Sequence, residues 1–299
     1  MKRPYLAMII GCGVLGAHAQ VRTEPHTAAE WTERGEVELK RAYYRDAESA
    51  FRKAVALTPD SANAHVLLAR ALIGELLPNL GMFPDTDGIL PKAEQAVNRA
   101  LELSPENVEA LCVSGIVNYK TAQSLRDPRQ QAQHLNQAKA AFDRALLLNP
   151  RSLEAHFELA RMESDTALNA LIQAQLRSGK PVKPGPLADT ELRHLLQRRY
   201  SAAIEDALAH TRTVLDIDPG YERAFGQMAG LFMARAQLQD DNGEYKVDMK
   251  VSENWRSKEA AAIAVRRSKT PEQQSIGGII GAVPSSAPPP PPPPPRVIP

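Results

Sequence analysis

Side chains that could do metal or acid–base chemistry are scattered along this chain rather than grouped in motifs. The histidines stand at positions 18, 26, 65, 134, 156, 194 and 210, and none forms the His-Glu-x-x-His pattern of zinc sites. The stretches DTDG and DDNG resemble fragments of calcium loops, but both lack the further alternating oxygen ligands and the closing glutamate. We therefore expect turns there, and a protein that is not an enzyme and holds no metal or cofactor.

Nucleophiles and phosphate-binding loops are equally sparse. If the segment 1–19 is removed, Cys112 is the one remaining thiol, and its apolar neighbours in an expected helix predict a buried, inert side chain. The sequence has no glycine-rich phosphate loop and no serine-centred nucleophile elbow. The basic stretches RHLLQRRY and RRSK lack interleaved aromatic residues, and the net charge is only +1, so we expect solvated helix faces rather than nucleic-acid binding.

The elements that hold these side chains follow from an internal repeat. Four stretches align without gaps: LTPDSANAH, LSPENVEAL, LNPRSLEAH and IDPGYERAF. Each has a proline followed five residues later by an alanine, and the pairs are Pro59 and Ala64, Pro105 and Ala110, Pro150 and Ala155, and Pro219 and Ala224. Because proline ends one helix before the next begins, each stretch predicts a boundary between two helices.

A packing pattern precedes each proline. Small and larger residues recur there at spacings of four and three, which places them on one helix face. The members are Ala47, Phe51 and Ala54; Ala93, Val97 and Ala100; Ala138, Phe142 and Ala145; and, with the pattern partly replaced, Ala207, Thr211 and Val214. The small residues let a neighbouring helix approach closely, and the larger one fills the gap between helices.

These features resemble the tetratricopeptide repeat, a helix–turn–helix unit of 34 residues. The first repeat carries most of the family signature: Trp31, Gly35, Ala47, Phe51, Ala54 and Pro59. It departs at Arg34 and Glu38, where the family has leucine and tyrosine. The third repeat keeps Gly115, Ala138, Phe142, Ala145 and Pro150. The resemblance implies an all-α solenoid of helical hairpins over residues 28–268, in which His65 and His156 take the packing place of Trp31.

The spacing between repeats departs from the family's unit length. From Pro59 through Pro105 and Pro150 to Pro219, every interval exceeds that length, and the last is about twice as long. We expect the surplus between the two helices of each hairpin, in LLPNLGMFPDTDGILP, SLRDPRQQAQ and LRSGKPVKPGPLADTE. The third break separates long helices predicted over residues 153–177 and 190–215. After a further helix over 221–237, DDNGEYK predicts a turn, and 252–267 a closing helix with Ser252 as its N-cap.

The resemblance also implies a partner-binding groove, because the first helix of each tetratricopeptide unit lines the concave face of the solenoid. Register transfers this face to Glu36, Lys40, Asn63, Arg70, Glu109, Tyr119, Phe157, Arg161 and Met233. Some family members clamp a C-terminal carboxylate with lysine and asparagine. The corresponding places here hold Thr32, Glu36, Leu67, Glu109 and Val113, so that ligand class is disfavoured. The expected partner is a protein or a peptide.

The start of the chain has the pattern of a secretory signal peptide. MKRPYLAMIIGCGVLGAHAQ combines a charged start, an apolar run from Leu6 to Leu15, and the small residues Ala17 and Ala19 before a cleavage point. We expect a signal peptide over 1–19, a linker over 20–27, and a periplasmic or secreted protein of the bacterial cell envelope. An uncleaved anchor and a lipid on Cys12 are the alternatives, and only these would attach the chain to a membrane.

The chain closes on SSAPPPPPPPPRVIP, whose prolines favour a polyproline II spacer of about 3.1 Å per residue. We expect residues 269–299 to form a disordered Gly/Pro-rich tail. Its sequence resembles the proline-rich periplasmic segment of TonB-type energy transducers, in which a small α/β domain follows that segment. The sequence thus leaves two functions open: an exported interaction scaffold built of helical repeats, or a truncated or partial transducer of the TonB type.

Overall fold

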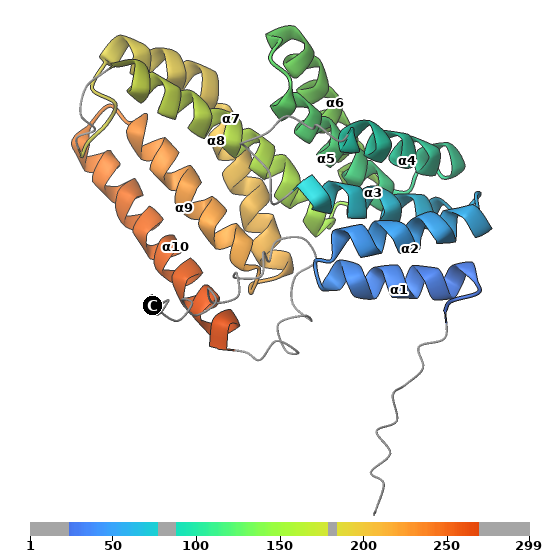
Figure 1. Cartoon of the computed structure of the whole chain (residues 1–299). Helices are drawn as coiled ribbons and strands as arrows, with labels where there is room; N and C mark the ends of the chain where they lie inside the picture. Colours follow the sequence, from blue (N-terminus) through green and yellow to red (C-terminus); the bar gives the residue numbers. More distant parts are fainter. Residues whose placement is uncertain (1–23, 77–87, 179–183, 269–299) are drawn as a thin grey trace, which may run out of the picture.

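Five helical hairpins follow one another in the computed structural model, which describes residues 24–76, 88–178 and 184–268 (Figure 1). The first helices of the hairpins are α1 (Ala28–Lys40), α3 (Ala62–Leu76), α5 (Val108–Ser124), α7 (Leu153–Ser178) and α9 (Glu222–Gln237). The second helices are α2 (Tyr44–Leu57), α4 (Ile89–Leu103), α6 (Pro128–Leu148), α8 (Thr190–Ile217) and α10 (Asn242–Ser268). No strand occurs in the three described ranges, and the predicted all-α fold class is confirmed.

The small and large residues of the packing pattern form the contacts between the two helices of a hairpin. Phe51 of α2 and Phe142 of α6 are fully buried, and each ring lies against a glycine of the preceding helix. A Cβ added at Gly35 would come within 2.5 Å of the Phe51 ring, and one added at Gly115 within 2.5 Å of the Phe142 ring. Glycine is therefore required at both positions for the two helices to approach this closely.

The two kinds of helix lie on different sides of the array. Each second helix from α2 to α8 packs against its own first helix and against the first helix of the next hairpin. The first helices also contact one another in series, from α1 to α9, whereas no comparable packing joins successive second helices among the described residues. Because the first helices are the closer set, the array bends towards them, and they line its concave face.

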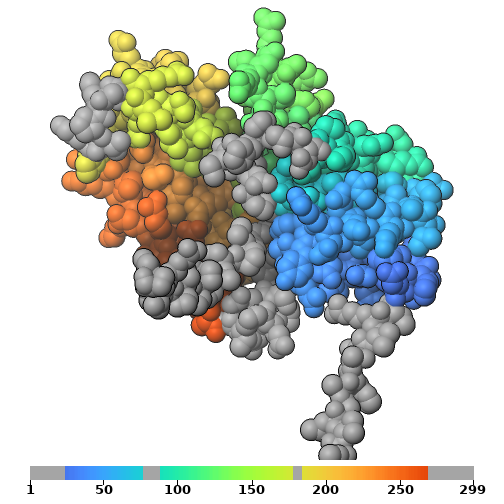
Figure 2. All heavy atoms as spheres, in the orientation of Figure 1, coloured from blue at the N-terminus to red at the C-terminus, as the bar shows by residue number. Residues whose placement is uncertain are grey.

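The hydrophobic core has two large clusters that meet at α7. The first cluster runs from α1 to α6 and includes Leu159 and Met162 of α7. The second takes in Ala160, Ala167 and other residues of α7, together with α8 and α9. Helix α7 thus joins the two parts of the array. Figure 2 shows a hollow on the surface between the C-terminal end of α7, in yellow-green, and the green tip of the α5–α6 hairpin.

The position of the surplus residues differs from the prediction in the second hairpin interval. SLRDPRQQAQ was expected to be a loop, but only residues 125–127 separate α5 from α6. The Asp127 side chain accepts a hydrogen bond from the Arg129 backbone N–H at 2.8 Å, and Pro128 occupies the first helical turn, where its missing N–H costs nothing. The Asp-Pro pair therefore starts a helix here, and the surplus lengthens α5 and α6.

The predicted first residue of the last helix was also wrong. DDNGEYK was expected to be a turn, yet α10 begins at Asn242, and the Asp241 carboxylate accepts a hydrogen bond from the Glu244 N–H at 3.1 Å. Ser252 is not an N-cap: it is buried in the middle of α10 and donates its hydroxyl to the Ala229 carbonyl of α9 at 2.7 Å. Asp241 takes the capping role instead, and the helix starts well before the predicted position.

The long fourth hairpin follows the prediction closely, since α7 and α8 begin at residues 153 and 190 and end at 178 and 217. Several other predictions lie outside the described residues. These are the signal peptide over 1–19, the first residues of the linker, most of the insertion LLPNLGMFPDTDGILP, and the Gly/Pro-rich tail over 269–299. None of the described helices is both long and apolar enough to cross a bilayer.

Candidate partner-binding groove

The concave face carries a charged network whose members recur at fixed distances from the repeat prolines. They stand four, eight, eleven and fifteen residues after a proline, and these spacings place them on one face of each first helix. We call these residues the groove network: Arg70 on α3; Glu109, Tyr119 and Lys120 on α5; Glu154, Glu158, Arg161 and Asp165 on α7; and Arg223 on α9. Tyr119 is the exception to the spacing and stands one residue before Lys120.

Arg70 joins three first helices at one end of the network. Its Nε donates to Glu109 Oε1 of α5 at 2.7 Å, and its two terminal nitrogens donate to the carboxylate of Glu154 on α7 at 2.7 and 2.6 Å. The Arg70 side chain is 9% exposed, while that of Glu109 is 44% exposed. A guanidinium held by two carboxylates in this forked geometry is a strong, directional contact, and it fixes the spacing of α3, α5 and α7.

Arg161 is the centre of the middle part of the network. Its Nε donates to Glu158 Oε2 at 2.7 Å, and its guanidinium lies 4.9 Å from the centre of the Tyr119 ring. The Tyr119 hydroxyl donates to Asp165 Oδ2 at 2.6 Å, which ties α5 to α7 a second time. Burial, and then the Asp165 charge, raise the pKa of Tyr119, so this hydroxyl stays a donor at any physiological pH.

At its α9 end the groove network is bordered by two aromatic rings, those of Phe157 and Tyr221, which lie beside Arg223. The Phe157 and Tyr221 rings meet edge to face with their centres 5.2 Å apart, and the Arg223 guanidinium lies 4.3 Å from the centre of the Phe157 ring. Arg223 also approaches Glu158 at 3.8 Å. Aromatic and cationic groups therefore alternate where α7 meets α9.

Lys120 differs from the other cations of the network. Its side chain lies among Tyr119, Arg161 and the acids of α7, but within the described part of the chain its ammonium donates only to Gln123 Oε1, at 3.3 Å. The residue is 6% exposed. Burial, and then the positive charge of Arg161, lower the pKa of Lys120 to about 8.

The structure brings together five of the nine groove residues expected from the sequence, namely Arg70, Glu109, Tyr119, Phe157 and Arg161. The remaining four lie apart from the network. Glu36 and Lys40 are on α1, and Asn63 is exposed on the first turn of α3. Met233 is half-buried and its sulfur lies 3.8 Å from Arg256 of α10, so its contact is with the last second helix.

Sequence reasoning missed Lys120, Glu154, Glu158, Asp165 and Arg223. Four of these stand at the same distances from a proline as residues that were included, and that register was the available signal. Glu154 and Arg223 match Glu109, and Lys120 and Asp165 match Lys40 when it is counted from Pro25. Their contacts could not be read from the sequence, because each joins residues far apart in the chain or depends on the offset between neighbouring helices.

Two histidines pack as the sequence predicted. His65 and His156 are buried, and the Nε2 of each lies against the carbonyl of a repeat proline, Pro59 at 2.9 Å and Pro150 at 3.0 Å. Because a carbonyl can only accept, each Nε2 carries the hydrogen. His156 Nδ1 is then an acceptor, and it receives a hydrogen bond from His210 Nδ1 of α8 at 2.8 Å.

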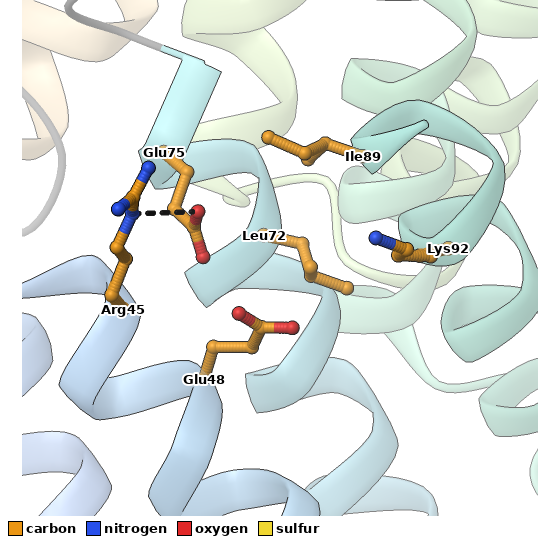
Figure 3. Close-up of a pocket in the computed structure, with 6 residues that line it drawn as sticks. All are labelled: Arg45, Glu48, Leu72, Glu75, Ile89 and Lys92. Carbon is orange, nitrogen blue, oxygen red and sulfur yellow. Dashed lines mark ion pairs between the residues drawn. The ribbon is translucent and has the colours of Figure 1, made fainter. Parts of the chain in front are cut away.

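A cavity of about 440 Å³ lies on the other side of α3, between α2 and α4 (Figure 3). The carboxyl groups of Glu48 and Glu75 enter it from α2 and α3, and Arg45 approaches Glu75 at 3.7 Å. Burial, and then the neighbouring Glu48, raise the pKa of Glu75 to about 7. This cavity continues into a wider trough of about 640 Å³, floored by Leu68 and Leu72.

Catalytic and metal chemistry has little support in the described part of the chain. No three histidine, cysteine or carboxylate side chains of these residues are placed to hold a metal ion. Cys112 is buried as predicted, and burial raises the pKa of its thiol to about 12, which makes the reactive thiolate rare at neutral pH.

Comparisons with known proteins agree with the repeat pattern. Residues 32–76, which span most of α1 together with α2 and α3, match the family described as the tetratricopeptide repeat. The segment is thus a tetratricopeptide repeat, and the later hairpins continue its register. The comparison with curated protein sequences found no match.

Several solved structures are similar to this chain. The chain is similar to TTC0263, a tetratricopeptide protein of Thermus thermophilus, at 16% identity and a TM-score of 0.49, over 80% of this chain and 100% of that one. It is similar to YrrB, described as a tetratricopeptide protein with an unusual peptide-binding site, at 13% identity and a TM-score of 0.43, over 80% and 92% of the two chains. MamA of Desulfovibrio magneticus RS-1 is similar at 13% identity and a TM-score of 0.44, over 82% and 100%.

Proposed function

We propose that this protein is an interaction scaffold that binds a segment of a partner protein across its first helices. The observation that carries the proposal is the groove network, which gathers charged and aromatic side chains from four consecutive first helices on the concave face. Several members keep accessible polar groups, since the side chains of Glu109, Asp165 and Glu154 are 44%, 38% and 28% exposed. An incoming segment can therefore exchange hydrogen bonds with the network without dismantling its buried contacts.

The size of the groove indicates how long this segment is. Neighbouring packed helices lie about 8–10 Å apart, so four first helices span about 30 Å. An extended chain advances about 3.3 Å per residue, which corresponds to about nine residues across the network. A surface of this length suits an extended peptide or one exposed strand or helix of a folded partner.

A selection of displayed random peptides on the purified full chain tests this function, with every peptide long enough to cross the whole network. We expect peptides to be enriched whose affinity, measured by fluorescence anisotropy, depends on the groove. The double variant Glu109→Gln, Asp165→Asn should change the affinity about tenfold, because it replaces two exposed, negatively charged acceptors of the groove face with neutral amides while keeping the shape of the side chains.

The matched control is the double variant Glu94→Gln, Glu102→Gln, which changes two exposed acids at the rim of the trough between α2 and α4. It should leave the affinity unchanged. An equal change in affinity for both pairs would show a general charge effect rather than binding in the groove, and a change for the trough pair alone would place the partner on the opposite face.

We further propose that the scaffold is exported, on the strength of the signal-peptide pattern in residues 1–19. The TonB-type alternative rests on the sequence of the proline-rich tail. The intact mass of the native protein in fractionated cells distinguishes the two. A mass matching residues 20–299 in the soluble envelope fraction supports an exported scaffold, and a membrane-bound protein with residues 1–19 intact or with further C-terminal mass supports a transducer.

A further inference from the structure

The ammonium of Lys120 is the one cation of the groove network, as the structure describes it, that lies beyond 4.0 Å from every described carboxylate. Its single polar contact among these residues is the amide oxygen of Gln123 at 3.3 Å, although an ammonium has three donors. The other cations of the network are paired: Arg70 with Glu109 and Glu154, Arg161 with Glu158, and Arg223 with Glu158. Buried charges in proteins are normally paired, so a lysine that is 6% exposed, with one neutral hydrogen-bond partner and the Tyr119 ring centre 5.6 Å from its ammonium, calls for a reason.

Two cations and two acids surround Lys120. Burial lowers the pKa of Lys120 to about 8, and the positive charges of Arg161 and Arg223 act in the same direction, against the acids Glu158 and Asp165. Each of these acids is already engaged, Glu158 by Arg161 and Asp165 by the Tyr119 hydroxyl. An anion arriving at this place would meet the Lys120 ammonium, which has no ion pair among the described residues, beside the Arg161 guanidinium, which already pairs with Glu158 and Asp165.

We propose that Lys120, together with Arg161, receives a carboxylate of the bound segment, supplied by an aspartate or glutamate side chain. This inference rests on the proposed function and names one chemical feature of its partner. The approach is open, because Gln123 is exposed and the Arg161 side chain is 20% exposed. The incoming carboxylate would replace the amide oxygen of Gln123 on the ammonium and accept from the Arg161 guanidinium.

A carboxylate fits this place better than a phosphate group does. Lys120 contributes one ammonium that has a neutral hydrogen-bond acceptor and no ion pair among the described residues, and a single carboxylate can pair with it. A phosphate carries about two negative charges at pH 7, and it would lie beside Asp165, whose side chain is 38% exposed. Asp165 would repel the two charges of a phosphate more strongly than the single charge of a carboxylate, so the acidic side chain is the group that matches the site better.

A double-mutant cycle between the protein and a selected peptide tests the site. Peptides enriched on the full chain should share an aspartate or glutamate, and changing it to asparagine or glutamine should weaken binding about tenfold to a hundredfold. Lys120→Met, which keeps an unbranched side chain of nearly the same length and removes the charge, should weaken binding of the acidic peptide by a similar factor. The peptide in which asparagine or glutamine replaces the acidic residue, which we call the amide peptide, should bind the parent chain and Lys120→Met with equal affinity.

Lys250→Met is the matched control, because Lys250 is exposed on α10, far from the groove network in the sequence and fold. Lys250→Met should change the affinity neither for the acidic peptide nor for the amide peptide. The helical circular dichroism signal of all variants should be the same as that of the parent. If groove-dependent peptides lack an acidic residue, or bind Lys120→Met as well as the parent, the carboxylate site is wrong and the scaffold stands. If no peptide is enriched on the parent chain, the scaffold itself fails, and the site with it.

Discussion

Lys120 has an ammonium that is buried without a carboxylate among the described residues, and this arrangement opposes folding. Removing the charge should therefore stabilise the protein in the absence of a partner. We expect Lys120→Met to raise the free energy of unfolding by about 1–3 kcal/mol at pH 7, measured by urea denaturation. Residues that serve binding at the expense of stability are common at functional sites.

The lowered pKa of Lys120 also predicts how the difference in the free energy of unfolding between the parent and Lys120→Met depends on pH. The pKa of Lys120 is about 8 in the folded chain, below its ordinary value of 10.5, so the unfolded chain binds more protons between these two values. The free energy of unfolding of the parent should rise with pH across this window relative to Lys120→Met. A variant that is less stable than the parent at pH 7 would show that the ammonium has a favourable partner.

The raised pKa of Glu75 predicts that its contribution to the free energy of unfolding depends on pH with the opposite sign. Burial and the neighbouring Glu48 raise its pKa to about 7, above the ordinary value of 4.5, so the folded chain binds more protons than the unfolded chain between these values. This contribution to stability is complete below pH 4.5 and is lost as the pH rises through 7. Glu75→Gln should lose this dependence, and its melting temperature should exceed that of the parent at pH 8.

The control for Glu75 is Glu94→Gln, at the exposed rim of the neighbouring trough. Its melting temperature should follow the parent from pH 4.5 to 8. If Glu75→Gln shows the same pH profile as the parent, the pKa of Glu75 is not raised in the folded chain.

At the scale of the elements, close contact between helices depends on glycines that face phenylalanine rings. Alanine is the better helix former by about 1 kcal/mol, yet a Cβ at Gly115 would lie 2.5 Å from the Phe142 ring. Overpacking of this kind costs about 1–3 kcal/mol, so Gly115→Ala should lower the melting temperature. Gly230→Ala is the matched control: its Cβ would meet Leu168 at 3.4 Å, an ordinary contact, and should leave stability equal or higher.

The hairpins could be predicted from the sequence because their signals are local. A proline, an alanine five residues later, and a small–large–small face before the proline fix where helices end and which side they bury. The errors arose at Asp-Pro in residues 127–128 and at Asp-Asn-Gly in 241–243, since the same residues form turns and cap helices. Which of the two occurs depends on whether the following segment can bury a face, and for α10 that face is Asp248 and Ser252 against α9.

The candidate site could be predicted only in part. Register placed Arg70, Tyr119 and Arg161 on the groove face, because every first helix repeats the same spacing from its proline. It could not show that Arg70 is held by Glu109 and Glu154, or that Lys120 has no such partner in the described part of the chain. These facts depend on how far each first helix slides along its neighbour, which the one-dimensional pattern does not contain.

At the scale of the whole molecule, the groove network occupies the junction of the two core clusters. Helix α7 contributes to both clusters, and it also carries four members of the network. A segment lying across the first helices would therefore contact both parts of the array at once. We therefore propose the groove face, rather than the trough between α2 and α4, as the place where the scaffold meets its partner.

Site-specific photo-crosslinking locates the partner most directly. A benzophenone amino acid placed at exposed Gln123, beside Lys120 on the groove face, should crosslink to a selected peptide on irradiation. The same group at exposed Gln95, in the trough on the other face, should not. Crosslinking at residue 95 without crosslinking at residue 123 would contradict binding in the groove.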